Sequence, residues 1–453
     1  MTQISSQLDR IIKAYDIRGL VDADVTEPVA FYLGAATADV LGTTHRFVVG
    51  RDMRPSSPSL ARAFIDGLTS RQAEVIDIGL ASTDQLYFAS GVLNAAGAMF
   101  TASHNPAEYN GIKLCRPGAA PIAIDTGLHA IGDRARQLAA LPLPATPDDS
   151  LVARRSFDAE FAEHVQRFVD LDPSDPIVVA VDAGNGMGGH IWPLVAADLP
   201  IDTRPLYFEL DGSFPHHPAD PLNPDNLRDL QAHVVEHHAA IGLAFDGDAD
   251  RVFAVDEHGD IVNASVVGAI VADRMLAKHP GATVLYNLIC SRIVPETIVR
   301  AGGQAGRTRV GHSFIKATMA DTDAIMAIEH SGHYYFRDNY RADSGVIAAL
   351  LLIEALTRSG RPLSELTADY NRYVQSGEHN FRVVDQAAAL QRVVASYADH
   401  GSVDHEDGVT VDLGDRWFNV RPSNTEPLLR VNVEAPDRRI LDDLLRDVTA
   451  LLT

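Results

Sequence analysis

The chain has 453 residues, of which 46% are apolar, so it is long enough for roughly three domains with sizeable cores. Its 61 acidic and 38 basic side chains give a net charge of −23, which argues against nucleic acid and an anionic membrane surface as partners. Two distant cysteines, the lack of a signal-like apolar segment near Met1 and the lack of a run of about 18 apolar residues favour a cytoplasmic protein that does not span a membrane.

Short apolar strands alternate with helical segments along most of the chain. Residues 47–49 read as a strand, and residues 60–68 have the spacing of a helix. The continuous apolar runs at 177–181 and 241–245 are typical of buried parallel strands, and residues 283–286 open a third such series. The recurring pattern predicts three related mixed α/β units.

The pattern changes from about residue 367 onward. Residues 409–413 and 428–433 read as strands of an antiparallel α+β unit, and the Pro-rich stretch 141–147 is a linker candidate. The fold class is therefore expected to be α/β, with three mixed α/β domains and a C-terminal α+β domain. The expected domains are residues 1–146, 147–251, 252–365 and 366–453.

Small polar residues at 101–106 follow an apolar run at 95–100 and end at Pro106, which stops a strand or helix. Ser103 is therefore expected on a loop at a strand end, where open α/β sheets bind ligands. An ordinary turn is the alternative, because Ser, Asn and Pro are turn residues. A catalytic pair of Ser103 and His104 is not expected, because neighbouring side chains in extended backbone point to opposite faces.

Three acidic residues, Asp246, Asp248 and Asp250, alternate along a loop that follows an apolar strand. Their carboxylates can converge on one hard cation such as Mg²⁺. The spacing also fits an EF-hand with Glu257 at position twelve, but Arg251 stands where that loop needs glycine, and both flanks read as strands. A solvated acidic turn is a third reading.

Residues 184–189 fit the G-x-G-x-x-G pattern of dinucleotide-binding folds, and Asp202 follows at a suitable distance. However, Pro193 would shorten the helix that should follow, and no second mononucleotide-binding half is evident. A tight strand-to-helix turn is favoured, and an NAD-dependent dehydrogenase is kept as a distant alternative.

Two further polar stretches are candidates for ligand binding. Residues 421–425 supply a guanidinium, hydroxyls and backbone N–H groups that suit a phosphate dianion, although a polar hairpin turn explains them equally well. Glu329, Ser331 and His333 are expected to stay out of the core, where a carboxylate and a hydroxyl could bind neighbouring sugar hydroxyls. His312 could act as an acid or base near neutral pH, although a lone histidine is more often structural.

In this order, the serine, acidic, Glu329 and Arg421 stretches resemble the four active-site loops of the α-D-phosphohexomutase family. Residues 13–19 resemble the N-terminal signature of that family, and residues 334–338 resemble its bacterial phosphomannomutase branch. The resemblance spans essentially the whole chain.

The resemblance implies four domains around a central cleft and reversible conversion of mannose 1-phosphate and mannose 6-phosphate. Phosphoryl transfer would use a phosphoserine at Ser103 and a bisphosphorylated hexose as intermediate or activator. One Mg²⁺ would bind Asp246, Asp248, Asp250 and the Ser103 phosphate. Phosphoglucomutase and phosphoglucosamine mutase activities are the near alternatives. The expected partners are small hexose phosphates, and the expected assembly is a monomer or weak homodimer.

The resemblance also implies roles for individual residues. The catalytic set would be Ser103, Arg251, His312 and Lys113. The substrate-binding set would be Tyr15, Arg18, Glu329, Ser331, His333, Arg421, Ser423, Asn424 and Thr425. Two positions depart from the family pattern. Ile328 stands where a glycine is usual, and Ile289 stands where many relatives have a cleft lysine, for which Arg292 or Arg309 could substitute.

Overall fold

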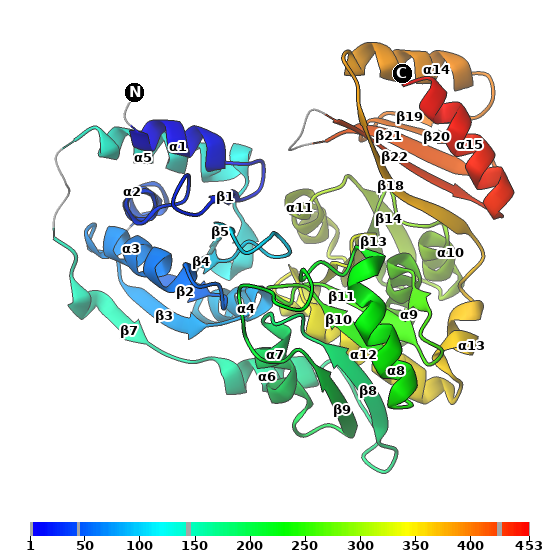
Figure 1. Ribbon diagram of the computed structural model, residues 1–453, viewed down its shortest axis with the longest axis horizontal. Coiled ribbons are helices and arrows are strands. Elements are labelled where there is room, and N and C mark those ends of the chain that lie inside the picture. Colours follow the sequence, from blue (N-terminus) through cyan, green and yellow to red (C-terminus); the bar gives the residue numbers. More distant parts are fainter. Residues whose placement is uncertain (1–2, 43–45, 142–145, 424–427, 453) are drawn as a thin grey trace.

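The computed structural model describes residues 3–42, 46–141, 146–423 and 428–452. Four sheets follow one another along the chain, each with its own helices, and form four domains (Figure 1). No helix in the described ranges combines the length and the apolar run needed to cross a bilayer. The linker candidate at 141–147 lies mostly outside the described residues.

Domain I contains a mixed sheet in the order β1-β5-β4-β2-β3-β7, with β6 paired to β5. Its strands are β1 Ile17–Leu20, β2 Phe47–Arg51, β3 Val75–Leu80, β4 Ala96–Phe100, β5 Tyr109–Arg116, β6 Ala120–Pro121 and β7 Val152–Arg154. Its helices are α1 Gln3–Ile11, α2 Glu27–Leu41, α3 Ser57–Thr69, α4 Thr83–Leu93 and α5 His129–Ala139. Glycines allow α2 and α3 to pack closely, because a Cβ at Gly34 would lie 2.1 Å from the carbonyl oxygen of Phe64.

Domain II has the strand order β12-β11-β10-β8-β9. Its strands are β8 Ile177–Asp182, β9 Ile201–Leu206, β10 Ile241–Phe245, β11 Val252–Asp256 and β12 Ile261–Val262, and its helices are α6 Asp158–Gln166, α7 Gly188–Ala196 and α8 Arg228–Glu236. Every residue of β10 is buried, as the continuous apolar run predicted. This central strand leads directly into the acidic loop.

Domain III has the order β14-β13-β15-β16-β17. Its strands are β13 Thr283–Asn287, β14 Gln304–Thr308, β15 Met326–Ile328, β16 Tyr334–Phe336 and β17 Ala342–Asp343. Its helices are α9 Ala264–Lys278, α10 Ile293–Arg300, α11 His312–Thr322, α12 Gly345–Ser359 and α13 Leu363–Ala368. The parallel pairing of β13 with both β14 and β15 matches the predicted α/β pattern.

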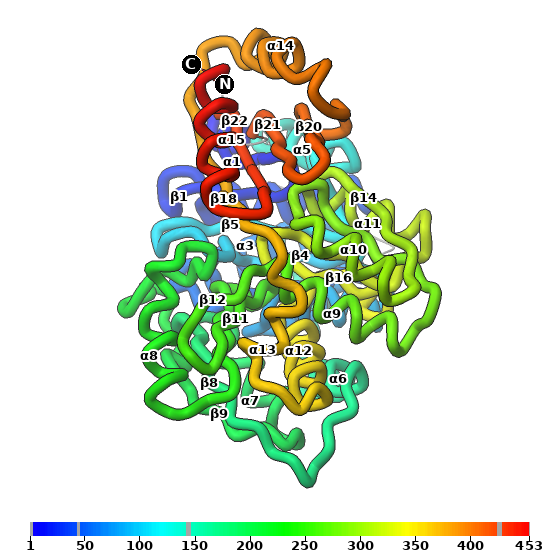
Figure 2. Tube along the Cα trace, turned by 90° about the vertical axis from the view of Figure 1, so that its right-hand side faces the viewer, coloured from blue at the N-terminus to red at the C-terminus, as the bar shows by residue number. Residues whose placement is uncertain are grey.

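Domain IV is an antiparallel sheet in the order β18-β22-β21-β20-β19. Its elements are β18 Val374–Arg382, α14 Gln386–Tyr397, β19 Ser402–Asp404, β20 Val409–Asp412, β21 Trp417–Pro422, β22 Leu428–Ala435 and α15 Arg438–Ala450. Asp437 caps the N-terminus of α15, because its side chain accepts from the Ile440 N–H, and the helix buries Leu441, Leu444 and Val448 along one face. Figure 2 shows α14 and α15 at the end of the molecule farthest from α6.

The apolar cores divide the molecule unevenly. One continuous core joins residues of domains II and III with part of domain I. A second core fills the rest of domain I, and domain IV has a core of its own. Domain IV also contacts domain III through a small apolar cluster of Leu288, Ile289 and Trp417, so its core is separate from the larger ones but not isolated.

The sheets do not follow the domain boundaries expected from the sequence. β7 ends at Arg154 and pairs with β3 of domain I, beyond the expected boundary at residue 146. β11 pairs with β10 across the expected boundary after Arg251, and the boundary after residue 365 falls inside α13. We therefore propose boundaries after Arg154, Val262 and Ala368, because strands of one sheet share hydrogen bonds and belong to one unit.

A buried ion cluster joins α9 to α12. Glu354 is fully buried and lies 2.8 Å from Arg274 and 2.7 Å from Lys278, and it accepts from the Asp170 N–H. Despite burial, Arg274 and Lys278 lower the pKa of Glu354 to about 2. The carboxylate therefore stabilises the fold above the unfolded value near 4.5, and this contribution is lost as pH falls toward 2.

We expect Glu354→Gln to lower the Tm by roughly 5 °C or more, because it leaves two partly buried cations without their counter-charge. Thermal unfolding at several pH values measures this. The variant's Tm should also depend less on pH between about pH 5 and pH 3. Glu365→Gln, at an exposed residue of α13, is the control, and an equal loss in both variants would contradict the role of the cluster.

Candidate functional site

A cleft of about 1640 Å³ lies between the four domains and is lined by side chains from each of them. It brings together eleven of the residues expected at the site: Tyr15, Arg18, Ser103, Lys113, Asp250, Arg251, His312, Glu329, Ser331, His333 and Arg421. Asp246 and Asp248 contact members of this lining. Asn424 and Thr425 lie outside the described residues.

The loop after β4 carries Ser103 and is held in shape by Arg54. Arg54 is fully buried, and its guanidinium donates at 2.7–2.9 Å to the backbone carbonyls of Ser103, Asn105, Pro106 and Tyr109. Buried carbonyl groups require hydrogen-bond partners, so one side chain satisfies most of this loop. The position of the Ser103 hydroxyl therefore depends on Arg54.

The Ser103 hydroxyl lies between a carboxylate and an imidazole. Its Oγ donates to Asp246 Oδ2 at 2.7 Å and lies 3.2 Å from His104 Nδ1. The expectation that Ser103 and His104 point apart is wrong, because Ser103 has φ = 47° and the backbone is not extended there. Burial, with Arg251 and Arg18 nearby, lowers the pKa of His104 well below its usual value. The neutral ring can therefore donate its Nδ1 proton to Oγ.

Asp246, Asp248 and Asp250 each place one carboxylate oxygen within 4.8 Å of the others, and all three are fully buried. Burial, with Asp250 and Asp248, raises the pKa of Asp246 well above its usual value. The Oδ1 atoms of Asp248 and Asp250 have no hydrogen-bond partner among the described residues. Unpaired buried carboxylate oxygens are costly, and a hard divalent cation satisfies them, so this group fits Mg²⁺. The flanking elements are strands, which excludes an EF-hand.

Lys113 holds the other oxygens of two of these acids. Its Nζ lies 2.8 Å from Asp248 Oδ2 and 2.6 Å from Asp250 Oδ2, and Thr83 also donates to Asp248 Oδ2. Despite burial, Asp248 and Asp250 raise the pKa of Lys113 well above its usual value, so the ammonium stays charged. Lys113 thus fixes the orientation of both carboxylates while their Oδ1 atoms remain available.

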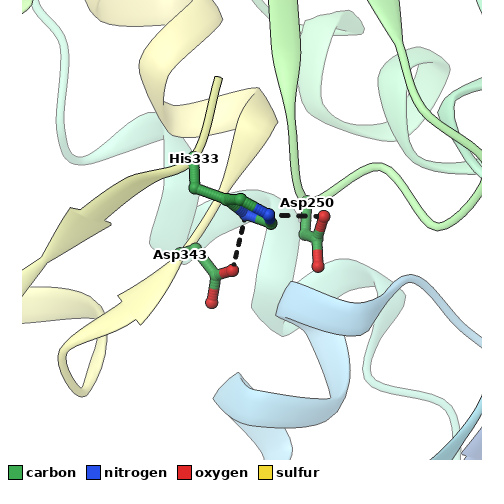
Figure 3. A group of neighbouring side chains, drawn as sticks. All are labelled: Asp250, His333 and Asp343. Carbon is green, nitrogen blue, oxygen red and sulfur yellow. Dashed lines mark ion pairs between the residues drawn. The ribbon is translucent and has the colours of Figure 1, made fainter. Parts of the chain in front are cut away.

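Arg251 and His333 connect the acidic loop to domain III. Arg251 Nε donates to His333 Nε2 at 2.9 Å and lies 3.6 Å from Asp246 Oδ2. His333 Nδ1 lies 2.9 Å from Asp343 and 3.7 Å from Asp250, between the two carboxylates (Figure 3). Because Nε2 accepts from Arg251, the ring proton belongs on Nδ1, facing the acids. His333 therefore orients Arg251 and also lines the cleft.

Glu329 lies in the tight turn between β15 and β16 and is only 5% exposed. The expectation that it stays out of the core is wrong, because its buried carboxylate has its own partners. Oε2 accepts from the Tyr335 hydroxyl at 2.8 Å, and Oε1 accepts from Asn287 at 3.2 Å. Glu329 and Ser331 still line the cleft, and Ile328 is the fully buried end of β15. The carboxylate is thus held in one orientation at the cleft wall.

His312 begins α11 at the cleft, with the Tyr15 ring edge-on at 5.3 Å. Burial, with Lys316, lowers the pKa of His312 to about 3. In the ligand-free protein the ring is therefore neutral at pH 7, which differs from the expected titration near neutrality. Arg18 donates to Asn105 at 2.7 Å and so contributes to the serine loop.

Two arginines from adjacent strands form the domain IV wall of the cleft. Arg421 on β21 and Arg430 on β22 are direct cross-strand partners. Both contact Glu378, Arg421 at 2.8 Å and Arg430 at 3.1 Å. The Ser423 N–H donates to the Leu428 carbonyl and closes the described part of this loop. A pair of guanidiniums is well suited to a phosphate dianion.

Sequence reasoning missed several of these residues. Arg430 was detectable, because β22 alternates polar Arg430, Asn432 and Glu434 with apolar neighbours, which indicates a strand with one polar face. Arg54 gave no signal, because its role depends on carbonyl groups about fifty residues away. His330 also lines the cleft. Burial, with Arg421 and Arg430, lowers the pKa of this histidine to about 3.

Neither basic residue considered as a substitute for the family lysine lines the described cleft. Arg292 binds carbonyl and carboxylate groups of domain IV, and the Arg309 guanidinium lies 4.6 Å from the centre of the Phe314 ring. Ile289 itself lines the cleft and packs against Trp417 of domain IV. This position is therefore apolar, and the domain IV wall of the cleft carries Arg421 and Arg430 as its basic residues.

The glycine-rich turn at 184–189 does not lead into a dinucleotide-binding helix. Helix α7 has only nine residues and contains Pro193. A Cβ at Gly186 would lie 2.8 Å from the carbonyl oxygen of Gly247, so the turn packs directly against the acidic loop. The tight-turn interpretation fits this packing.

Comparison with known proteins agrees with this description of the site. A protein of Xanthomonas campestris pv. campestris named "Phosphohexose mutases" is 41% identical over 446 residues, which cover 97% of this chain and 98% of that protein. The chain belongs to the phosphoglucomutase/phosphomannomutase family. Its alpha/beta/alpha domains I, II and III match residues 9–140, 159–259 and 263–373, and its C-terminal domain matches residues 378–451.

Other members of this family are similar over the full length. The phosphomannomutase of Salmonella montevideo is 36% identical over 451 residues, covering 97% of this chain and 98% of that protein. The crystal structure of a phosphoglucomutase/phosphomannomutase family protein from Burkholderia thailandensis has a TM-score of 0.88 and 29% identity, covering 100% of this chain and 97% of that one. The family and the four-domain α/β fold expected from the loops are confirmed.

We expect Asp248→Asn to weaken Mg²⁺ binding by about tenfold or more, because it removes one of three carboxylate charges. Calorimetric titration of Mg²⁺ into chelator-treated protein measures this without any substrate. Asp202→Asn removes the same charge from an exposed residue of domain II and should titrate like the unchanged protein. Equal affinities in all three proteins would rule out Asp248 as a ligand.

Proposed function

We propose that the protein is a phosphomannomutase that interconverts mannose 1-phosphate and mannose 6-phosphate through a phosphoserine at Ser103. The observation that carries this proposal is the 2.7 Å contact of Ser103 Oγ with Asp246, inside a cleft that also contains the paired guanidiniums of domain IV. A nucleophilic hydroxyl next to a cation site and opposite an anion site suits transfer between two ends of one sugar phosphate.

Substrate binding is assigned to two walls of the cleft. Arg421, Arg430 and Ser423 would hold the phosphate that is not being transferred. Glu329 and Ser331 would bind neighbouring sugar hydroxyls, and the fixed orientation of the Glu329 carboxylate supports such a role. Tyr15 and Arg18 extend the lining on the side of domain I.

The transfer step needs little covalent chemistry from the protein. The sugar O6 attacks phosphorus, the bond from phosphorus to Ser103 Oγ breaks, and the proton that O6 loses is balanced by one that Oγ gains. His104 Nδ1 is placed to donate a hydrogen bond to Oγ as it leaves. The bisphosphorylated sugar then reorients within the cleft so that its other end faces Ser103, and its O1 phosphoryl group passes back to Ser103.

Charge neutralisation is assigned to the acidic loop and Arg251. Asp246, Asp248, Asp250 and a phosphate oxygen on Ser103 would hold one Mg²⁺, which supplies charge neutralisation for the transferring phosphoryl group. Arg251, oriented by His333, offers its fork of donors to the same phosphoryl oxygens. Lys113 keeps two of the acids in place.

Domain IV supplies the moving part. Its own apolar core would let it pivot as a unit about the small cluster that Trp417 forms with Leu288 and Ile289, and closure over a bound sugar phosphate would exclude water from the phosphoserine. Phosphoglucomutase or phosphoglucosamine mutase activity is the alternative, and the Xanthomonas relative named for phosphohexoses supports a broader substrate range. A panel of mannose, glucose and glucosamine phosphates separates these possibilities.

We expect Ser103→Ala to abolish nearly all mutase turnover, because the hydroxyl accepts the phosphoryl group. The Tm should fall by no more than a few degrees, because the change removes a single small buried group and its hydrogen bond to Asp246. Coupled assay and thermal unfolding measure the two quantities. Intact mass should show one added phosphate on the unchanged protein and none on the variant. Ser59→Ala, at an exposed residue of α3, is the control, and half-maximal activity in Ser103→Ala would exclude the phosphoserine.

We also expect glucose 1-phosphate to be turned over, with a kcat/KM within about a thousandfold of that for mannose 1-phosphate. The two sugars differ only at C2, and neither Glu329 nor the arginine pair is assigned to O2. A site that hydrogen-bonds a hydroxyl can discriminate by about 10⁴ or more, whereas an unread hydroxyl gives little discrimination.

Glu329→Ala should impair both substrates together, and Glu236→Ala on the exposed face of α8 is its control. A selective loss of one substrate would assign Glu329 a contact with O2.

A further inference from the structure

The two arginines of domain IV share a single carboxylate. Arg421 Nη2 lies 2.8 Å from Glu378 Oε2, and Arg430 Nη1 lies 3.1 Å from Glu378 Oε1. Arg421 and Arg430 are direct partners across β21 and β22, and like charges in such a pair destabilise a sheet. The pair therefore needs an anion in the ligand-free protein, and Glu378 supplies it.

Local backbone geometry aims Glu378 at the arginines. The pairing of β18 with β22 shifts register between Gln375 and Glu378, and Gly377 adopts a φ of +72°. Bulges of this kind redirect a side chain and are frequent beside active sites. Glu378 lines the cleft and its side chain is 23% exposed, whereas that of Arg421 is only 3% exposed.

Glu378 does not satisfy the two guanidiniums. The Nε atoms of Arg421 and Arg430 are buried and have no hydrogen-bond partner among the described residues. A carboxylate offers two oxygens to the pair, whereas a phosphate group offers three and carries more charge. A phosphate at this position would therefore replace a weaker anion by a stronger one.

We propose that Glu378 is an internal competitor of the substrate phosphate, occupying Arg421 and Arg430 when the site is empty and giving way when phosphate binds. The proposal rests on the proposed function, which also explains why an internal competitor would be useful. During turnover the bisphosphorylated sugar must release one phosphate and present the other. If release left the buried Arg421 guanidinium and the partly exposed Arg430 guanidinium without a counter-charge, it would be slow, and Glu378 takes over their charge at that moment.

Phosphate affinity tests this directly. Calorimetry with inorganic phosphate should give about three- to tenfold tighter binding for Glu378→Gln than for the unchanged protein, the effect of removing one competitor from partly exposed ion pairs. Asp442→Asn, which removes a carboxylate paired with exposed Arg438, is the matched control and should bind phosphate unchanged. The gain must disappear in the double variant with Arg430→Met, which locates it at this pair.

Kinetics provide the second readout. Glu378→Gln should lower both KM and kcat for the hexose phosphate, because substrate binds more tightly and turns over more slowly. Glu378→Asp keeps the charge with a shorter reach and should fall between the two proteins. Unchanged or weaker phosphate binding in Glu378→Gln would overturn the proposal and leave Glu378 as a structural support. Phosphate binding does not require mutase turnover, so failure of the proposed function gives a different result.

Discussion

The close packing of like charges at the acidic loop is the constraint on which the rest of the site depends. Four carboxylates lie together in the buried wall of the cleft: Asp246, Asp248, Asp250 and Asp343. Three cations lie among them: Lys113, Arg251 and Lys316. The cations come from domains I, II and III, so the acids can be packed only when the three domains are docked. The continuous core that joins these domains keeps the cations positioned next to the acids.

The same division of the cores explains why the anion site lies where it does. Chemistry at Ser103 needs rigid geometry, and the serine loop, the acidic loop and the Glu329 turn all belong to the part of the chain held by shared or directly packed cores. The arginine pair lies on domain IV, which has a separate core. A phosphate held by that pair can therefore be drawn toward Ser103 or released without disturbing the acidic loop.

Much of this arrangement was predictable from the sequence. Ser103 lies on one short loop after an apolar strand, and the three aspartates lie on another. Residues that are close together in the chain can be recognised in the sequence alone. Arg54 and Glu378 were not predictable, because each acts through partners that only the folded chain brings near. The Ser103–His104 contact was missed because it depends on a left-handed backbone at a residue that rarely adopts one. The boundaries that we propose from sheet membership differ from those expected, because strand pairing is not visible in local composition.

Ile289 shows how one apolar residue changes the balance of the cleft. The resemblance to the family led us to expect a cleft lysine at this position, and an ammonium there would add charge to the cleft between domains III and IV. Ile289 instead packs against Trp417, while nearby Arg292 pairs with Asp412 of domain IV. The position thus holds two domains together. On the domain IV wall of the cleft, the positive charge available to a phosphate comes from Arg421 and Arg430, and one carboxylate, Glu378, contacts both. Ile289 thus contributes packing between domains III and IV, and charge for a phosphate on the domain IV wall is left to the arginine pair.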